Sequence, residues 1–153
     1  MTSDERRKLV DLLIRHEGVR LTVYRDSRGI ESIGVGRNLR DVGISYTEAM
    51  TLLDHDIDAA IVSVETLSWF DGLNSVRQRV VLDLRFNLGL IGLQGFTQMI
   101  DAIKRGAFDE AADHLLDSQY AVQLPARAQE NAQLLRAGVD SEVPDGPSPA
   151  HEG

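Results

Sequence analysis

The sequence predicts an α+β fold that is mostly α, with a small β-hairpin lobe and a larger helical lobe. Two patterns lead to this prediction. A stretch with helical spacing of apolar residues ends at Gly18, and a glycine-rich stretch of period two follows at once. The second half of the chain returns to helical spacing, punctuated by single glycines. The chain also has no cysteine, so no disulfide supports this fold.

The first helix is expected to run from about Ser3 to Glu17. Its apolar face is formed by Leu9, Val10, Leu12, Leu13 and Ile14. Ser3 can cap its start, and Asp4 and Glu5 suit the first turn. Glu17 then falls in the last turn, where the negative end of the helix dipole destabilises a carboxylate. A surface helix has little reason to place an acid there, so this position indicates a chemical role.

A β-hairpin is predicted directly after this helix. Residues 21–26 alternate with period two, residues 27–29 supply a turn, and residues 30–36 form the return strand. Gly34 and Gly36 remove side chains from one face of that strand, as happens where a ligand or another backbone comes close.

Three polar side chains are expected to converge on one cleft beside this hairpin. Glu17 is at the helix end, Asp26 is at the end of the first strand, and Ser32 is in the return strand. Each also has a purely structural interpretation: a solvated helix-end acid, a turn-capping Asp, and an ordinary strand hydroxyl.

The spacing of these residues resembles a known family. Glu17-Gly18, followed by Tyr24-x-Asp26-x-x-Gly29-x-x-Ser32-Ile33-Gly34-x-Gly36, is similar to the catalytic stretch of the bacteriophage T4-type lysozymes, or endolysins. Later stretches agree in order: Phe86-Asn87-Leu88-Gly89, Gly95-Phe96-Thr97, Phe108-Asp109-Glu110-Ala111-Ala112 and Pro125-x-Arg127-Ala128. The resemblance covers about residues 5–138. It implies a lysozyme-like fold with a cleft between the lobes.

The resemblance also implies the activity of a muramidase. Such a glycoside hydrolase cuts peptidoglycan between N-acetylmuramic acid and N-acetylglucosamine, which leads to lysis of the bacterial cell wall. Glycosidic cleavage needs an acid for the leaving oxygen and a second group that supplies or activates the nucleophile. The family gives Glu17 the role of general acid and Asp26 that of base or electrostatic partner, with inversion at the anomeric carbon. Ser32 stands where the family usually has Thr, so it keeps the hydroxyl but loses the methyl group that restricts its rotamer.

Further roles follow from the same resemblance. The implied substrate-binding residues are Phe86, Asn87, Arg37 and Asn38. The implied supporting residues are Arg127, which pairs with the catalytic Glu in the family, Gly34 and Gly36. Phe86 and Asn87 also suit a helix core and a helix end, and Arg127 suits an ordinary surface position. Arg37 stands where the family often has His.

The remaining elements are mostly helical. Residues 38–45 predict a loop, and a second helix from about Thr47 to Leu67 suits a connection between the lobes. A helix from Ser75 to Gly89 carries the expected core stripe of Val76, Val80, Val81, Leu84 and Leu88. Further helices are expected near 96–104, 108–118 and 124–137, with Gly106 and Gly138 as stops. Trp69 is expected to pack in the core or at the junction of the lobes and not to serve as a platform for a sugar.

The predicted catalytic domain comprises residues 1–138. Its small lobe covers about 17–55, and its helical lobe combines the N-terminal helix with about 56–138. Relative to the longer family members, the chain lacks part of the small lobe after Gly36. This difference concerns the reach of the sugar-binding groove and not the chemistry.

The charge of the chain is strongly negative and uneven. The chain has 24 acidic and 16 basic residues, and four of the acids lie in 139–153, so residues 1–138 carry a net charge of −4. The 139–153 segment also contains three prolines and no Lys or Arg, which predicts a disordered tail. An acidic chain is a poor partner for nucleic acid or an anionic membrane surface.

Several other classes of protein are disfavoured. The four histidines are scattered without ligand spacing, so no metal or other cofactor is expected. No apolar run approaches the ~20 residues that span a bilayer, and the first residues do not resemble a signal peptide. A monomer made in the host cytoplasm is expected to reach the wall after membrane permeabilisation or by delivery with a virion.

Two alternative functions remain open at this stage. A lytic transglycosylase needs only one acid, because the 6-hydroxyl of the sugar itself attacks, but Asp26 and Ser32 disfavour it. A catalytically silent wall-binding or virion structural module can retain the same fold, but it has no need for an intact Glu17 and Asp26.

Overall fold

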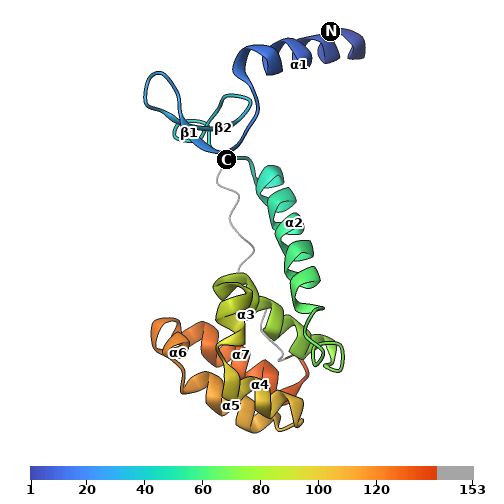
Figure 1. Ribbon diagram of the computed structural model, residues 1–153, viewed down its shortest axis with the longest axis vertical. Helices are drawn as coiled ribbons and strands as arrows, with labels where there is room; N and C mark the ends of the chain where they lie inside the picture. Colours follow the sequence, from blue (N-terminus) through green and yellow to red (C-terminus); the bar gives the residue numbers. More distant parts are fainter. Residues whose placement is uncertain (141–153) are drawn as a thin grey trace. The chain divides into compact units, whose positions relative to one another are not determined.

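A computed structural model describes residues 1–140 of the chain (Figure 1). The described part is mostly helical and contains one small antiparallel sheet of three strands in the order β1-β2-β3. This confirms the predicted α+β class with mostly helical content. The chain divides into two compact units, one of Met1–Leu53 and one that begins at Asp54.

The first unit begins with helix α1, Ser3–Glu17. Thr2 is its N-cap, because the Thr2 backbone is extended and its hydroxyl accepts a hydrogen bond from the Glu5 N–H at 3.3 Å. The prediction of Ser3 as the cap was therefore wrong by one residue. The helix ends at Gly18 as predicted, with a φ of 72° and the Gly18 N–H bonded to the Ile14 carbonyl.

The sheet consists of β1 (Arg20–Arg25), β2 (Glu31–Gly34) and β3 (Arg37–Asn38). Ser32 of β2 pairs with Tyr24 on one side and Asn38 on the other, so it lies in the middle strand. Strand β2 ends at Gly34 instead of Gly36, because the chain reverses at Val35 and Gly36. The reversed chain forms β3 where the sequence predicted a loop.

Helix α2, Tyr46–Val64, has a reciprocal cap at its start. The Glu48 N–H donates to the Ser45 hydroxyl at 3.2 Å, and the Ser45 N–H donates to the Glu48 carboxylate at 2.7 Å. The helix ends three residues before the predicted Leu67, where the Leu67 N–H instead closes a turn on the Val64 carbonyl. The boundary between the two units falls within α2.

The second unit is helical. Its elements are α3 (Ser75–Gln94), α4 (Thr97–Lys104), α5 (Phe108–Leu116), α6 (Gln119–Gln123) and α7 (Pro125–Ala137). Gly89 interrupts α3 with a φ of 71°, which confirms that the first part of this helix ends there. Helix α6 was not predicted, since five residues are too few to show a helical period.

The predicted core stripe is confirmed in this unit. Val76, Val80, Val81 and Leu84 of α3 are buried, and Leu88 is partly buried against the same cluster. The other large, fully buried side chains are Leu93 near the end of α3 and, from other helices, Val64, Met99, Leu115 and Leu135. Figure 1 shows α3, α4, α5 and α7 packed together in this unit.

The end of α7 is fixed to the start of α3. The Arg77 guanidinium donates to the Leu135 and Arg136 carbonyls and stacks on the Phe108 ring, 3.5 Å from its centroid. Gly138 ends α7 with a φ of 67°, and a Cβ there would lie 2.6 Å from the Arg77 guanidinium carbon. The left-handed backbone and the nearby guanidinium both favour glycine at this position.

The predicted lobe and tail boundaries compare with the structure as follows. The structure divides between Leu53 and Asp54, with α1 in the first unit, and the predicted lobe boundary near residue 55 stays a prediction. The assignment of the N-terminal helix to the helical lobe, like the cleft between lobes, stays a prediction. Of the predicted tail, Val139 and Asp140 are described, and Asp140 forms an ion pair with Arg79. Residues 141–153 lie outside the described residues.

Candidate functional site

Glu17 is the last residue of α1, and its carboxylate lies against the turn between β2 and β3. A Cβ added at Gly36 would lie 3.3 Å from Glu17 Oε2 and 3.5 Å from Glu17 Cδ. Gly36 also has a φ of 72°, a conformation that other residues rarely adopt. Gly36 therefore meets two requirements at once: a left-handed backbone and room for the Glu17 carboxylate.

Gly34 shares only the first of these requirements. Its φ is 69°, but a Cβ built there meets no heavy atom within 4 Å. Gly34 is therefore expected to support the site only by allowing the backbone to turn as it leaves β2.

Asp26 follows β1 and closes the hairpin turn. Its N–H donates to the Ile30 carbonyl at 2.9 Å, and its carbonyl accepts from the Gly29 N–H at 2.9 Å. Its Oδ1 accepts from the backbone N–H of Arg28 at 2.8 Å and from that of Ile30 at 2.9 Å. Its Oδ2 lies 3.7 Å from the Arg28 guanidinium. The turn-capping interpretation is thus correct, and it leaves one carboxylate oxygen without a hydrogen bond from the described residues.

These contacts determine the charge of Asp26. The backbone N–H of Ile30 holds the pKa of Asp26 below its usual value, and the Arg28 N–H and guanidinium act in the same direction. Desolvation opposes them but does not outweigh them. Asp26 is therefore an ionised carboxylate at neutral pH, as expected of a base or electrostatic partner.

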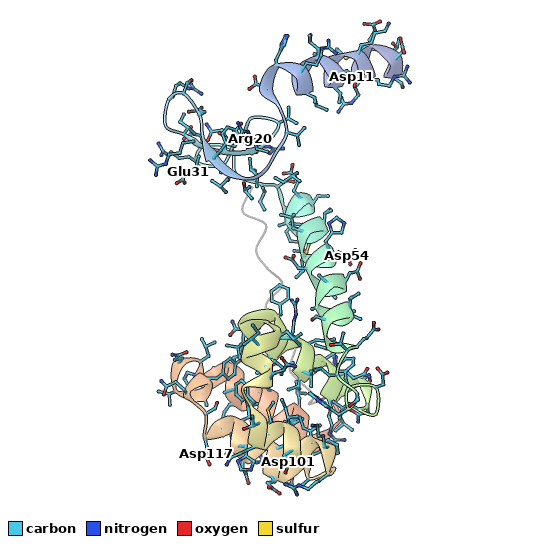
Figure 2. All side chains as sticks on the ribbon, in the orientation of Figure 1. Asp11, Arg20, Glu31, Asp54, Asp101 and Asp117 are labelled. Carbon is cyan, nitrogen blue, oxygen red and sulfur yellow. The ribbon has the colours of Figure 1, made fainter. Side chains whose placement is uncertain are left out.

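Ser32 is 3% exposed in the middle strand. Its hydroxyl makes one long hydrogen bond, 3.4 Å to the Ile30 carbonyl. Asp26 is bonded to Ile30 just before β2, and Glu17 lies against Gly36 just after it. Along the chain, Ser32 of β2 therefore comes between Ile30, whose N–H bonds to Asp26, and Gly36, which lies against the Glu17 carboxylate. Glu31, at the start of this strand, is labelled in Figure 2.

The two predicted substrate-binding residues of the first unit have structural partners. Arg37 Nη2 donates to Glu48 Oε1 at 2.6 Å, which joins β3 to the first turn of α2. Asn38 accepts from the Asp41 N–H and donates to the Asp41 carboxylate, both at 2.9 Å, and so shapes the loop after β3. Their binding of substrate stays a prediction.

The other predicted residues lie in the second unit. Phe86 is 44% exposed on α3, and Asn87 is exposed beside it, just before Gly89. Arg127 of α7 forms a two-point ion pair with Asp83 of α3, at 2.9 Å from Nε and 2.5 Å from Nη2. The pairing of Arg127 with Glu17 stays a prediction.

Asp83 was missed by sequence reasoning. Burial disfavours its charge, but hydrogen bonds from Arg127 and from Asn131 (2.7 Å) outweigh burial and lower the pKa of Asp83. The signal was present, because an acid inside the apolar run Val80-Val81-Leu82-Asp83-Leu84 needs a partner. Its partner is 44 residues away in sequence and could not be read from spacing.

Metal binding and membrane crossing are two other properties on which the described residues, 1–140, bear. No group of three or more His, Cys, Asp or Glu side chains there is placed to hold a metal ion. No helix in this part of the chain combines the length and the apolar composition needed to cross a membrane.

Comparison with known proteins places the chain among lysozymes. The model of the family described as phage lysozyme matches residues 14–133, which include Glu17, Asp26, Ser32 and Arg127. The endolysin of Salmonella phage P22 is 32% identical, over 80% of this chain and 92% of its own length. "Probable T4-type lysozyme 2" of Dictyostelium discoideum is 25% identical, over 86% of this chain and 95% of its own length.

A third relative is a part of a larger protein. The pre-baseplate central spike protein Gp5 of Enterobacteria phage T4 is 25% identical over 85% of this chain, but the match covers only 28% of the spike protein. The family model spans most of the chain, and the two acids and the hairpin that carried the resemblance lie within the matched range. The chain therefore belongs to the phage lysozyme family, the lysozyme type of peptidoglycan hydrolases.

Proposed function

We propose that this protein is a muramidase that hydrolyses the β-1,4 bond between N-acetylmuramic acid and N-acetylglucosamine. The observation that carries the proposal is the environment of Asp26. Two backbone N–H groups hold its Oδ1 and favour the ionised form, while its Oδ2 accepts no hydrogen bond from the described residues. A base that must take a proton from water needs this combination of charge and a free oxygen.

In the proposed reaction, the two acids have opposite tasks. Glu17 gives its proton to the glycosidic oxygen as the bond to the anomeric carbon breaks. A water molecule attacks the anomeric carbon from the opposite face, and Asp26 takes the proton that this water releases. The reaction ends with Glu17 ionised and Asp26 protonated, and exchange with solvent restores both. The new hydroxyl has the inverted configuration.

Ser32 is proposed to hold the attacking water. Its hydroxyl belongs to the middle strand and makes one long hydrogen bond of 3.4 Å among the described residues, to the Ile30 carbonyl. It can therefore turn toward a water molecule at little cost. Because the group positions a water and does not itself transfer a proton, its removal is expected to cost less activity than removal of either acid.

Further residues are proposed to contact the glycan. Phe86 offers an exposed ring and Asn87 an exposed amide. Arg37 and Asn38 lie in β3, directly after Gly36, against which the Glu17 carboxylate rests. Arg127, held by Asp83, is proposed to orient Glu17 in the enzyme before substrate binds.

The proposed setting of this reaction is bacterial wall lysis by a phage-related protein. The partner is the peptidoglycan strand, and the acting unit is a monomer that needs no cofactor. The name of the Salmonella phage relative, endolysin, supports release from within the host cell. The name of the spike protein relative supports action from the virion, and its matched portion is a small part of a larger assembly protein.

The direct test compares the wild-type chain with Glu17→Gln on purified peptidoglycan. The wild type should clear the suspension, and the variant should lose at least about 100-fold in rate, because acid–base groups contribute about 10²–10⁴-fold. Circular dichroism should show that both chains are equally folded. A variant that keeps more than about a tenth of the rate would reject Glu17 as the acid.

Product analysis separates the mechanisms. Hydrolysis yields reducing ends, whereas a lytic transglycosylase yields 1,6-anhydro ends, and mass spectrometry distinguishes the two. Proton NMR during the first minutes of the reaction should show the α-anomer of the new reducing end, as inversion requires. A β-anomer would indicate retention through a covalent intermediate, and the absence of any cleavage by a folded wild-type chain would favour a silent wall-binding module.

A further inference from the structure

A pocket in the second unit is lined by none of the residues proposed for catalysis or substrate binding. Its volume is about 510 Å³, within the usual range for small-ligand sites. It is formed by the turn after α2, the end of α3 and one face of α4. Its lining residues are Thr66, Leu67, Ser68, Trp69, Gln94, Thr97, Ile100, Asp101 and Lys104.

Trp69 provides one wall of this pocket and is the only tryptophan of the chain. Its ring is partly buried against the hydrophobic core, so its position is fixed. Its indole N–H makes no hydrogen bond to a described residue. The N–H is also not fully buried, so it remains open to solvent. The expectation that Trp69 packs against the core therefore accounts for only part of the side chain.

The rest of the pocket offers polar groups that the described structure does not use. The Ser68 and Thr97 hydroxyls and the Gln94 amide lie on its lining, and none of them bonds to another residue in 1–140. Asp101, labelled in Figure 2, already accepts a bond of 3.0 Å from Arg105. Lys104 lines the pocket and forms no ion pair within the described range.

This combination matches the chemistry of an amino sugar. A pyranose ring presents a face of C–H groups, which packs on an aromatic ring, and an edge of hydroxyl and N-acetyl groups, which needs amide and hydroxyl partners. The carboxylates of a muramic acid unit or its stem peptide are anions that Lys104 can attract. A mainly apolar ligand would leave these polar groups unpaired and is disfavoured.

We propose that this pocket is a second, non-catalytic site that binds N-acetylated sugar units of a peptidoglycan strand. The inference rests on the proposed function, since it assigns the same polymer to a second place on the chain. Two weak sites on one polymer raise the overall affinity, because the second contact is made within an already formed complex. Such a site gives an acidic enzyme a means to stay on an anionic wall.

The uniqueness of Trp69 makes a direct binding assay available. The Glu17→Gln chain, which is expected not to cut the sugar, is titrated with tri-N-acetylchitotriose while tryptophan emission is recorded. The emission should change and saturate. The same titration with a free stem peptide should give a smaller change, or none.

Two double variants in the Glu17→Gln background locate the response. Gln94→Ala with Lys104→Ala removes two pocket side chains but leaves Trp69 in place. Gln133→Ala with Lys8→Ala makes the same chemical changes at exposed positions outside the pocket. The first variant should weaken binding of the trisaccharide, and binding to purified sacculi in a pelleting assay, by about tenfold. The second should bind as its parent does.

Three results would overturn the site. These are an emission that does not respond to the trisaccharide, a response that both double variants share equally, and a response to the stem peptide alone. If the wild-type chain clears peptidoglycan while any of these is found, the hydrolase proposal stands and the second site falls. If the wild-type chain fails to clear peptidoglycan but the pocket variant selectively loses sugar binding, the glycan site stands and the hydrolase proposal falls.

Discussion

Oδ1 of Asp26 accepts two backbone N–H bonds, and Oδ2 of the same carboxylate accepts none from the described residues. The hairpin turn therefore sets both the charge of this side chain and the direction of its available lone pairs. Because the donors belong to the backbone, no side-chain substitution removes them without also moving the turn. At the scale of the residue, the carboxylate that closes the hairpin turn is the same group that the proposed chemistry uses as its base.

The first prediction concerns the acidic limb of the pH profile. A folded-state pKa below the usual Asp value of about 3.9 keeps Asp26 ionised as the pH falls through 4. The activity that depends on ionised Asp26 should therefore persist to below about pH 4. Measurement of kcat/KM on a soluble peptidoglycan fragment between pH 3 and 7 checks this, with circular dichroism as a control for unfolding. An acidic limb centred above pH 5 in a folded enzyme would contradict it.

The second prediction separates the two roles of Gly36. Gly36→Ala and Gly34→Ala both place a Cβ on a left-handed backbone, so each should destabilise the protein by about 1–2 kcal/mol. Only the Gly36 variant places that Cβ against the Glu17 carboxylate. At a temperature where both variants are folded, Gly36→Ala should lose at least about tenfold more activity than Gly34→Ala. Equal losses would show that the contact with Glu17 does not matter.

At the scale of the element, much of the helical part of the fold could be predicted from the sequence. The stop of α1 at Gly18, the core stripe of α3 and the ends at Gly89 and Gly138 follow from apolar spacing and glycine position. Strand β3 could not be predicted, because two residues show no period and its pairing depends on Ser32 of another strand.

The same limit applies to the candidate site. Local spacing predicts Glu17, Asp26 and Ser32 around one hairpin; in the structure Glu17 ends α1 before the hairpin, Asp26 lies in its turn and Ser32 lies in β2. The contact between Glu17 and Gly36, and the link from Asp83 to Arg127, depend on how distant segments meet. Such contacts depend on packing in three dimensions and produce no periodic pattern in the sequence.

The third prediction tests the link between α3 and α7. Asp83→Ala removes the partner of Arg127 and Asn131, and it should destabilise the protein by about 1–2 kcal/mol, since the pair is only partly buried. Asp83→Asn keeps the shape of the side chain and part of its hydrogen bonding, so it should cost less. Urea unfolding at pH 7 measures both.

Acid should reveal the charge contribution of this pair. The pKa of Asp83 is lowered on folding, so the stability it contributes is present above the unfolded-state value of about 3.9 and is lost as the pH falls through the lower folded-state value. The difference in stability between wild type and Asp83→Asn should therefore shrink below about pH 4. A difference that grows with acidity would contradict this assignment.

At the scale of the whole molecule, the net charge of −8 opposes approach to an anionic wall. Three arginines around the hairpin lie beside acids. Arg25 is paired with Glu31, Arg28 lies beside Asp26, and Arg37 is paired with Glu48. The long-range encounter of enzyme and wall should therefore be repulsive at low salt.

The fourth prediction follows from this repulsion. The initial rate of clearing should rise as ionic strength increases from about 0.01 M to 0.1 M, because the Debye length falls from about 30 Å to about 10 Å. A chain that ends at Gly138 lacks four acids and should show a smaller rise. A chain that ends at Asp140 controls for loss of the ion pair between Arg79 and Asp140, because it keeps that pair. A rate that falls steadily with salt in the full chain would mean that a local basic surface outweighs the net charge.

Glu48 serves two partners, and this double use has an evolutionary consequence. Its carboxylate completes the cap of α2 with Ser45 and also pairs with Arg37 of β3. A cap is satisfied by Glu or Gln alike, whereas a guanidinium bonds more strongly to the charged acid than to a neutral amide. Lineages that replace Arg37 by a neutral residue should therefore tolerate Gln at position 48, while lineages that keep Arg37 should retain Glu. The two positions are expected to change together, although eleven residues separate them.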